Sequence, residues 1–156
     1  MKQSLPLVLV AGLVACGAAP GSSTTPSPTP VGKGPRVLMP SGAVYSVEVA
    51  RTPEETSQGL MYRESLPPRT GMIFLFTDSA PHNFWMKNTM IPLDIIWLDA
   101  AGKVIFVSAN TPPCKSDPCP TYGPNTPAPI VLEIAGGMAA KEGVVAGATL
   151  RLAEIR

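Results

Sequence analysis

Short apolar runs of strand length, separated by turn residues, dominate the hydrophobic pattern of this chain after residue 36. Residues 37–39 and 43–50 flank Ser41-Gly42, and the second run alternates apolar with polar side chains, which predicts an opening β-hairpin. The run from Gly71 to Phe76 is continuously apolar, which predicts a strand that is buried on both faces.

A second hairpin and a short helix give the other clear local signals. Residues 93–98 and 103–109 are rich in large apolar side chains and flank a four-residue turn that ends with Gly102. Thr52-Pro53-Glu54-Glu55 combines a capping hydroxyl, a proline at the first helical position and a glutamate three residues after the cap. We therefore expect a helix that begins there and ends at Gly59.

The last third of the chain is predicted to return to the sheet after a long loop. Residues 110–127 hold six prolines, which exclude a central strand and predict a long loop, either ordered or disordered, and the two cysteines in it favour order. Residues 130–134 and 149–155 are expected to form strands, and 138–142 one helical turn. Six to eight short strands with one or two brief helices predict a mainly β domain of the α+β type, a small antiparallel barrel or sandwich.

The N-terminal residues have the plan of a cleaved export signal. Lys2 precedes an apolar run, residues 5–14, that is too short to span a bilayer. The stretch that ends at Cys16, Leu-Val-Ala-Cys, resembles the bacterial lipobox, in which the cysteine is acylated and becomes the new N-terminus. We expect a lipoprotein signal peptide over residues 1–15, a lipidated Cys16 followed by a Pro/Ser/Thr-rich tether over residues 16–35, and a single β-rich domain over residues 36–156.

Charge narrows the choice of partners. Without Lys2 the mature chain carries eleven basic and eleven acidic residues, so it has no electrostatic footprint for nucleic acid. Membrane contact is expected to come from the acyl chains on Cys16. We expect an exported protein anchored to the cell envelope, in the outer membrane if the host has one and otherwise on the outer face of the plasma membrane. The expected partner is an envelope glycan or protein.

Several motifs in the folded part resemble those of one bacterial and archaeal family. They are Thr52 to Glu54, Gln58 to Arg63, Gly71 to Phe74, Phe84 to Thr89, Ile91 to Asp94, Pro113-Cys114, Pro118 to Tyr122 and Val131 to Glu133. From Val49 to about Leu152 the chain resembles the domain-of-unknown-function 192 family. The resemblance implies a compact, mainly antiparallel β domain that is often exported. It implies no established reaction, so no catalytic residue is carried over from it.

Lys87, Asn88 and Asp94 form the first candidate site. Asp94 lies among large apolar residues, where an ionised carboxylate needs a partner, and Lys87 is the nearest cation in the sequence. A bend between them would bring the two charges together, either as a structural ion pair or, with Asn88, as a site for ligand binding or proton transfer. A small, hydrolase-like envelope enzyme that uses these three residues is therefore the alternative to a binding or structural domain.

Aromatic side chains beside loops are candidates for ligand binding. Trp85 and Tyr122 lie next to predicted loops, where their rings would be free to stack on the sugar rings of a glycan. Trp97 and Phe84 are expected in the core, because aromatic side chains dominate β-sheet cores. Arg63, at the end of one family motif, is a further binding candidate.

Glu133 is the last binding candidate. It alternates with apolar residues in a predicted strand, and it would form a glycosidase-like pair of carboxylates with Asp94 if both faced the same space. The simpler expectation is that one of these carboxylates is exposed and the other is paired.

Cys114 and Cys119 are expected to form a disulfide bond in an exported protein, because the four residues between them can turn. Their spacing differs from Cys-x-x-Cys, which argues against redox catalysis. We expect no metal site, because His82 is the only histidine and the methionines are more simply core residues. No cofactor is expected either.

Overall fold

The structure is a computed structural model that describes residues 33–78 and 80–155. The predicted signal peptide, Cys16 and most of the predicted tether lie outside the described residues. The strands are β1 (Arg36–Leu38), β2 (Val44–Ala50), β3 (Thr70–Leu75), β4 (Phe84–Trp85), β5 (Leu93–Leu98), β6 (Val104–Thr111), β7 (Thr121–Tyr122), β8 (Ile130–Ala135) and β9 (Arg151–Ala153). The helices are α1 (Pro53–Gln58) and α2 (Met138–Lys141).

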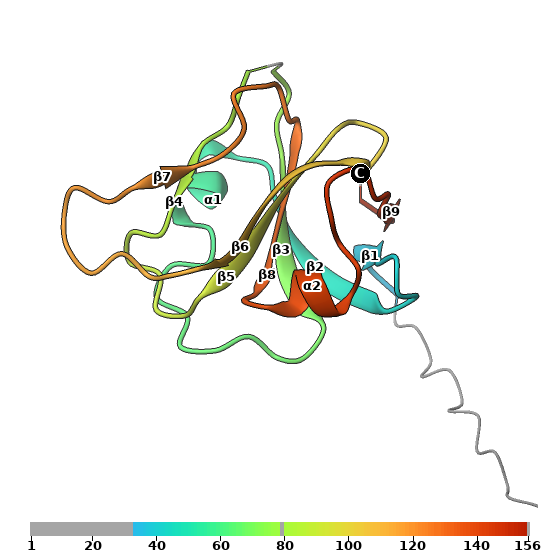
Figure 1. Ribbon diagram of the computed structural model, residues 1–156, viewed down its shortest axis with the longest axis horizontal. Coiled ribbons are helices and arrows are strands. Elements are labelled where there is room, and N and C mark those ends of the chain that lie inside the picture. The colour runs from blue at the N-terminus through green and yellow to red at the C-terminus, as the bar shows by residue number, and fades with distance from the viewer. Residues whose placement is uncertain (1–32, 79, 156) are drawn as a thin grey trace, which may run out of the picture. The chain divides into compact units, whose positions relative to one another are not determined.

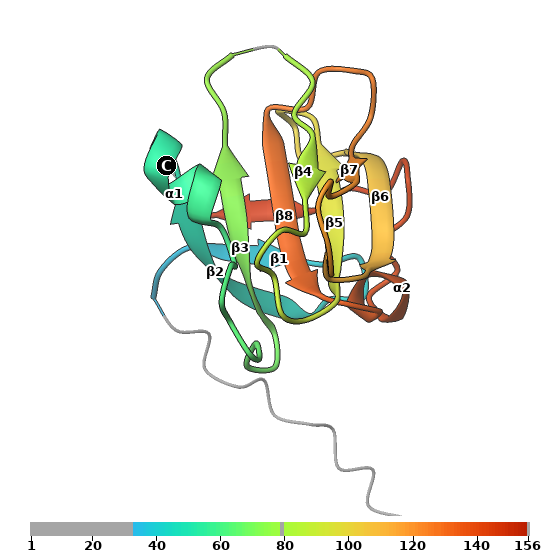
Figure 2. The same cartoon turned by 90° about the vertical axis from the view of Figure 1, so that its left-hand side faces the viewer.

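Seven of the strands form one curled sheet in the order β6-β5-β8-β3-β2-β1-β9, and β4 pairs with β7 in a separate two-stranded ribbon (Figure 1). Neighbouring strands are antiparallel except for β2 and β3, which are parallel and are joined through α1. The predicted fold class, mainly β with two short helices, is confirmed. In Figures 1 and 2 α1 and the β4–β7 ribbon lie on one side of the sheet, and α2 lies on the other.

The locally predicted elements are confirmed. β1 and β2 form the opening hairpin, and β5 and β6 form the second one, in which β6 runs on to Thr111. At the start of α1 the hydroxyl of Thr52 accepts a hydrogen bond from the Glu55 N–H at 3.2 Å, while the Glu55 carboxylate accepts from the Thr52 N–H at 3.0 Å. Gly59 ends the helix with a positive φ of 49°. The proline-rich segment differs from a simple loop, because it contains β7.

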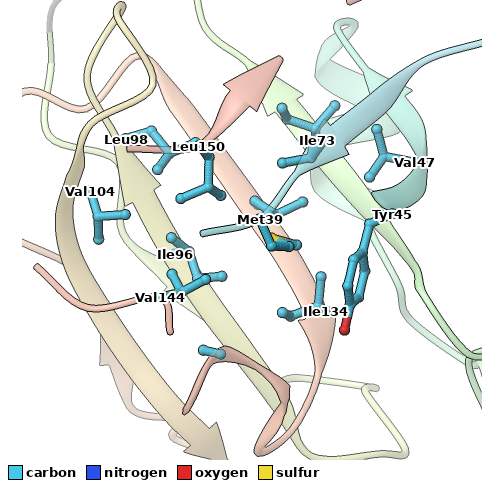
Figure 3. Packing of buried hydrophobic residues seen from close by; sticks show 13 residues of the cluster. Met39, Tyr45, Val47, Ile73, Ile96, Leu98, Val104, Ile134, Val144 and Leu150 are labelled. Atoms are coloured by element: carbon cyan, nitrogen blue, oxygen red, sulfur yellow. The ribbon is translucent and has the colours of Figure 1, made fainter. Parts of the chain in front are cut away.

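The sheet separates two apolar clusters. The first contains residues from β1, β2 and α2, and in Figure 3 its labelled side chains gather around Met39. The second lies beneath α1 and the β4–β7 ribbon, and its buried members are Ala50, Leu60, Met72, Phe74, Met86, Leu93, Ile95, Trp97, Ala128 and Val131. Because both faces of the central strands are covered, every residue of β5 is buried, and Glu133 is buried in the middle of β8.

Candidate functional site

Asp94 is held by backbone groups, not by a cation. Its carboxylate accepts hydrogen bonds from the N–H groups of Asn110 at 2.6 Å, Gly137 at 2.9 Å and Ala139 at 2.6 Å. The residue is fully buried, and the start of α2 supplies two of the three donors. Three N–H donors satisfy a carboxylate without a counter-ion, so Asp94 ties β5, β6 and α2 together.

The predicted contact between Lys87 and Asp94 is therefore wrong. The Lys87 Nζ atom pairs instead with the Asp117 carboxylate at 2.9 Å and lies 5.5 Å from the centroid of the Trp85 ring. The partner is thirty residues away in the proline-rich segment, so proximity in sequence pointed to the wrong carboxylate.

Asn88 joins two segments of backbone. It has a positive φ of 55°, its carbonyl oxygen accepts from the Tyr62 N–H at 2.8 Å, and its side-chain amide donates to the Met61 sulfur at 3.9 Å. These contacts fix the segment after α1 against the segment after β4. Lys87, Asn88 and Asp94 thus have three separate environments, and the structure does not bring them together as the predicted catalytic site.

Glu133 is the exceptional carboxyl group of the described chain. Three carboxylic residues are buried there: Asp94, Glu142 and Glu133. Glu142 accepts hydrogen bonds from the hydroxyl groups of Tyr45 and Ser41, whereas Glu133 Oε2 has no hydrogen-bond partner among the described residues. Burial alone raises the pKa of the Glu133 carboxyl from 4.5 to about 8, so the group is mainly protonated at neutral pH.

The expectation that one carboxylate is exposed is also wrong, and Glu133 does not share a space with Asp94. Glu133 is 5% exposed. In the sheet register Glu133 lies opposite Ile95, while Asp94 lies opposite Ile134. Since successive side chains of a strand point to opposite faces, the two carboxyl groups lie on opposite sides of the sheet. The arrangement excludes the glycosidase-like pair.

A pocket opens over Glu133 on the side of the sheet that carries α1. We call it the Glu133 pocket. Its empty volume is about 270 Å³ when the open solvent at its mouth is included, and the space that the centre of a water-sized sphere can reach is about 30 Å³. Its lining residues are Thr56, Ser57, Gln58, Gly59, Leu60, Met61, Phe74, Phe84, Trp85, Thr89 and Glu133. Three of them carry hydroxyl groups and three carry aromatic rings, so the pocket offers both hydrogen-bonding and stacking surfaces.

Two local features shape the pocket. Gly59 lacks a side chain where an added Cβ would lie 3.8 Å from Glu133 Oε2 and 3.3 Å from the Phe74 ring. Phe74 and Phe84 meet edge to face with centroids 4.9 Å apart, which fixes the aromatic wall. Trp85 follows at the mouth and is 48% exposed.

The remaining binding candidates have structural partners. The Arg63 guanidinium makes a two-pronged ion pair with Glu48, with one contact at 2.7 Å, and this pair lowers the pKa of the Glu48 carboxyl. Tyr122 is half-buried where β7 pairs with β4. As predicted, Trp97 lies in the core, where it is fully buried, and Phe84 packs against the same cluster. Trp85 is therefore the sequence-predicted aromatic residue that the structure leaves most open to a ligand.

Cys114 and Cys119 form the predicted disulfide, with their Cα atoms 5.6 Å apart. The bond closes a short loop just before β7, and Cys114 N–H donates to the Met86 carbonyl at 3.0 Å. The disulfide therefore braces the ribbon that carries Trp85. Within residues 33–78 and 80–155, no cluster of three or more His, Cys, Asp or Glu side chains is arranged to hold a metal ion.

Sequence reasoning missed the pocket because its parts come from four separate segments. The segment Gln58 to Met61 belongs to a family motif, but nothing in its sequence indicates that it lines a pocket with Glu133. The one usable signal was Gly59, whose position after a capped helix permits a close approach.

These features define the class of protein: a small, curled β domain with a pocket over a buried, protonated carboxyl group. The chain belongs to the domain-of-unknown-function 192 family, described as "Uncharacterized ACR", whose family model matches residues 36–152. The predicted family resemblance is thus confirmed. No curated protein matches the chain.

Two solved structures are similar to this chain. One is a protein of unknown function from Novosphingobium aromaticivorans DSM 12444, which is 38% identical, with a TM-score of 0.68 over 75% of this chain and 82% of that chain. The other, from Sinorhizobium meliloti 1021, is described as a proposed transcription regulator; it is 33% identical, with a TM-score of 0.68 over 78% of this chain and 93% of that chain. The family has no defined activity, so the function is argued from the site.

Proposed function

We propose that this protein is an envelope lipoprotein whose β domain binds a saccharide of the cell envelope at the Glu133 pocket. The observation that carries the proposal is the half-exposed Trp85 ring at the mouth of a pocket that also offers hydroxyl groups and a carboxyl group. A sugar presents an apolar ring face, which can stack on the Trp85 ring, and a rim of hydroxyl groups, which can hydrogen-bond to the polar lining of the pocket.

The hydrogen-bonding part of the site comes from the end of α1 and from the segment after β4. Thr56, Ser57 and Gln58 line one wall and Thr89 lines another. The Thr56 hydroxyl already donates to the Thr52 carbonyl at 3.0 Å, so it offers an acceptor, while the side chains of Ser57 and Gln58 can donate as well as accept. A protonated Glu133 carboxyl adds one donor and one acceptor at the base of the pocket.

The stacking part of the site is preorganised. Lys87 lies over the Trp85 ring and is itself held by Asp117. On the backbone, Trp85 pairs with Thr121 of β7, close to the disulfide. A ring that is already fixed loses little conformational freedom when a ligand stacks on it, which favours binding.

Export and anchoring rest on the sequence of the first sixteen residues and are supported by the disulfide. Disulfide bonds persist in oxidising compartments outside the cytosol. In the part of the chain that the structure describes, no helix has the length and apolar character needed to cross a bilayer. Attachment through acyl groups on Cys16 is the route that we propose, because two or three acyl chains hold a protein durably at a membrane.

Tryptophan fluorescence tests the saccharide proposal, because the chain has two tryptophans with opposite environments. Titration of the domain with soluble envelope oligosaccharides is expected to shift or quench the emission of Trp85. In the Trp85→Phe variant the response should disappear while the emission of the buried Trp97 remains. An unchanged spectrum across fragments of peptidoglycan and of the surface polysaccharides would contradict the proposal.

A further inference from the structure

Among the residues that the structure describes, Glu133 is the one ionisable group that lines its pocket, and no cationic side chain lines it. Glu133 Oε2 is buried, lacks a hydrogen-bond partner among the described residues, and faces Gly59. An unsatisfied buried oxygen costs free energy, and natural structures rarely keep one without a reason. The pocket therefore leaves this oxygen available to a hydrogen-bonding group that enters from its mouth.

The lining shows which sign of charge the pocket favours. Phe74, Phe84 and Trp85 present aromatic rings, whose faces carry partial negative charge and attract cations. The last residues of α1 line another wall, and the final carbonyl groups of a helix carry partial negative charge as well. The aromatic rings and the end of α1 therefore favour a cation over an anion, and the Lys87 ammonium beside Trp85 is itself paired with Asp117.

Charged side chains on the elements around the pocket are already engaged. Lys87 is paired with Asp117, and Arg63 is paired with Glu48. On α1, the carboxylate of Glu55 caps the opposite end of the helix, where Glu54 also lies. Burial alone shifts the pKa of Glu133, with no contribution from any of these charges. Within residues 33–78 and 80–155 the carboxyl group therefore has no counter-ion.

We infer that the Glu133 pocket receives a primary ammonium group, so that the saccharide bound there is an amino sugar with a free amine. The inference rests on the proposed function, in which the sugar ring stacks on Trp85. The ammonium group would donate one hydrogen bond to Glu133 and has two further N–H donors for the hydroxyl-bearing residues Thr56 and Thr89.

Binding of such a group is coupled to proton release. The free pocket holds a protonated carboxyl, and the ligand arrives as R–NH₃⁺. When the ion pair forms, the carboxyl O–H bond breaks, the electron pair stays on the carboxylate, and the proton leaves to solvent. At about pH 6, below the Glu133 pKa of about 8, each binding event should release close to one proton.

The experiment is calorimetry at about pH 6 in two buffers of different ionisation enthalpy, with D-glucosamine as the probe and D-glucose and N-acetyl-D-glucosamine as neutral controls. For the natural protein we expect glucosamine to bind at least about tenfold more tightly than either control. The dependence on buffer should report release of close to one proton. In Glu133→Gln, which keeps the shape of the neutral side chain, the preference and the release should both vanish.

The failures of the two claims are distinguishable. Equal binding of all three sugars with no proton release would overturn the ammonium inference and leave saccharide binding intact. If glucosamine keeps its advantage in Glu133→Gln, the inference is also overturned. Ethylammonium serves as a probe without a sugar ring. Proton-releasing binding of ethylammonium that is lost in Glu133→Gln, with no binding of any sugar, would support the ammonium site and overturn the saccharide proposal.

Discussion

At the scale of single residues, the described part of this domain contains three buried carboxyl groups that differ in their hydrogen-bond partners. Asp94 and Glu142 each receive hydrogen bonds from donors in the fold, and Glu133 has none among the described residues. A buried carboxyl without donors is stable mainly in its neutral form, so its proton becomes part of the folded state. Glu133 and Asp94 should therefore affect the stability of the domain in different ways.

Glu133 should make the stability of the domain fall as the pH rises. Its folded pKa of about 8 exceeds the ordinary 4.5, so its contribution is fully present below about pH 4.5 and is lost as the pH rises to 8. The slope reaches at most about 1.4 kcal/mol per pH unit. Urea unfolding of Glu133→Gln should show a flatter profile and a higher free energy of unfolding at pH 8. Parallel profiles for the two proteins would contradict this assignment.

Asp94 should be far more costly to remove than an exposed acid. Asp94→Ala leaves three N–H donors without their acceptor, for an expected loss of about 3 kcal/mol or more in the free energy of unfolding. Asp117→Ala is the control, because it breaks an exposed ion pair worth less than about 1 kcal/mol. Chemical denaturation measures both losses. Similar values for the two variants would disprove the structural role of Asp94.

The sequence located Asp94 as a buried charge that needs a partner, but it could not identify that partner. Backbone N–H groups carry no signature in the sequence, and two of the three donors come from a turn more than forty residues away. The burial of Glu133 is still harder to predict from the sequence. In a strand covered on both faces, alternation with apolar residues does not reveal whether a polar side chain points to solvent or to the interior.

At the scale of elements, local signals predicted most of the secondary structure. The two hairpins and α1 are encoded by turn and capping residues that lie within a few positions of each other. The β4–β7 ribbon was not predicted, because each strand has two residues and they pair across more than thirty positions. The parallel pairing of β2 and β3 also has no signal in the local sequence. The pocket depends on both of these missed features, since α1 bridges the parallel pair.

The disulfide should stabilise the β4–β7 ribbon more than it stabilises the seven-stranded sheet. Closing so short a loop contributes about 2 kcal/mol by the chain-entropy estimate. In a Cys114→Ser/Cys119→Ser variant we expect faster amide exchange at Thr121 and Tyr122 and a red-shifted, more quenchable Trp85. Trp97, in the core, should not change. Hydrogen exchange and acrylamide quenching test this; uniform loss of protection across the sheet would contradict it.

At the scale of the whole molecule, the proposed anchor and the folded domain have separate roles. Cys16 would hold the protein at the membrane, and the predicted tether would let the domain reach its ligand. The Cys16→Ser protein should be absent from the detergent-soluble membrane fraction. The purified domain should still fold and bind its ligand. Cell fractionation with a palmitate label measures this. A natural protein that takes up no label, or a Cys16→Ser variant that stays labelled and membrane-bound, would rule out lipidation at this position.

The most direct measurement of the central claim is nuclear magnetic resonance of the nitrogen-15-labelled domain titrated with glucosamine oligosaccharides. We predict that shifts change first at Thr56 to Met61, at Thr89 and at the indole N–H of Trp85, with the indole N–H of Trp97 as the internal reference. Changes confined to other surfaces, such as the exposed Phe106, or no changes at saturating sugar, would contradict a binding site at the Glu133 pocket.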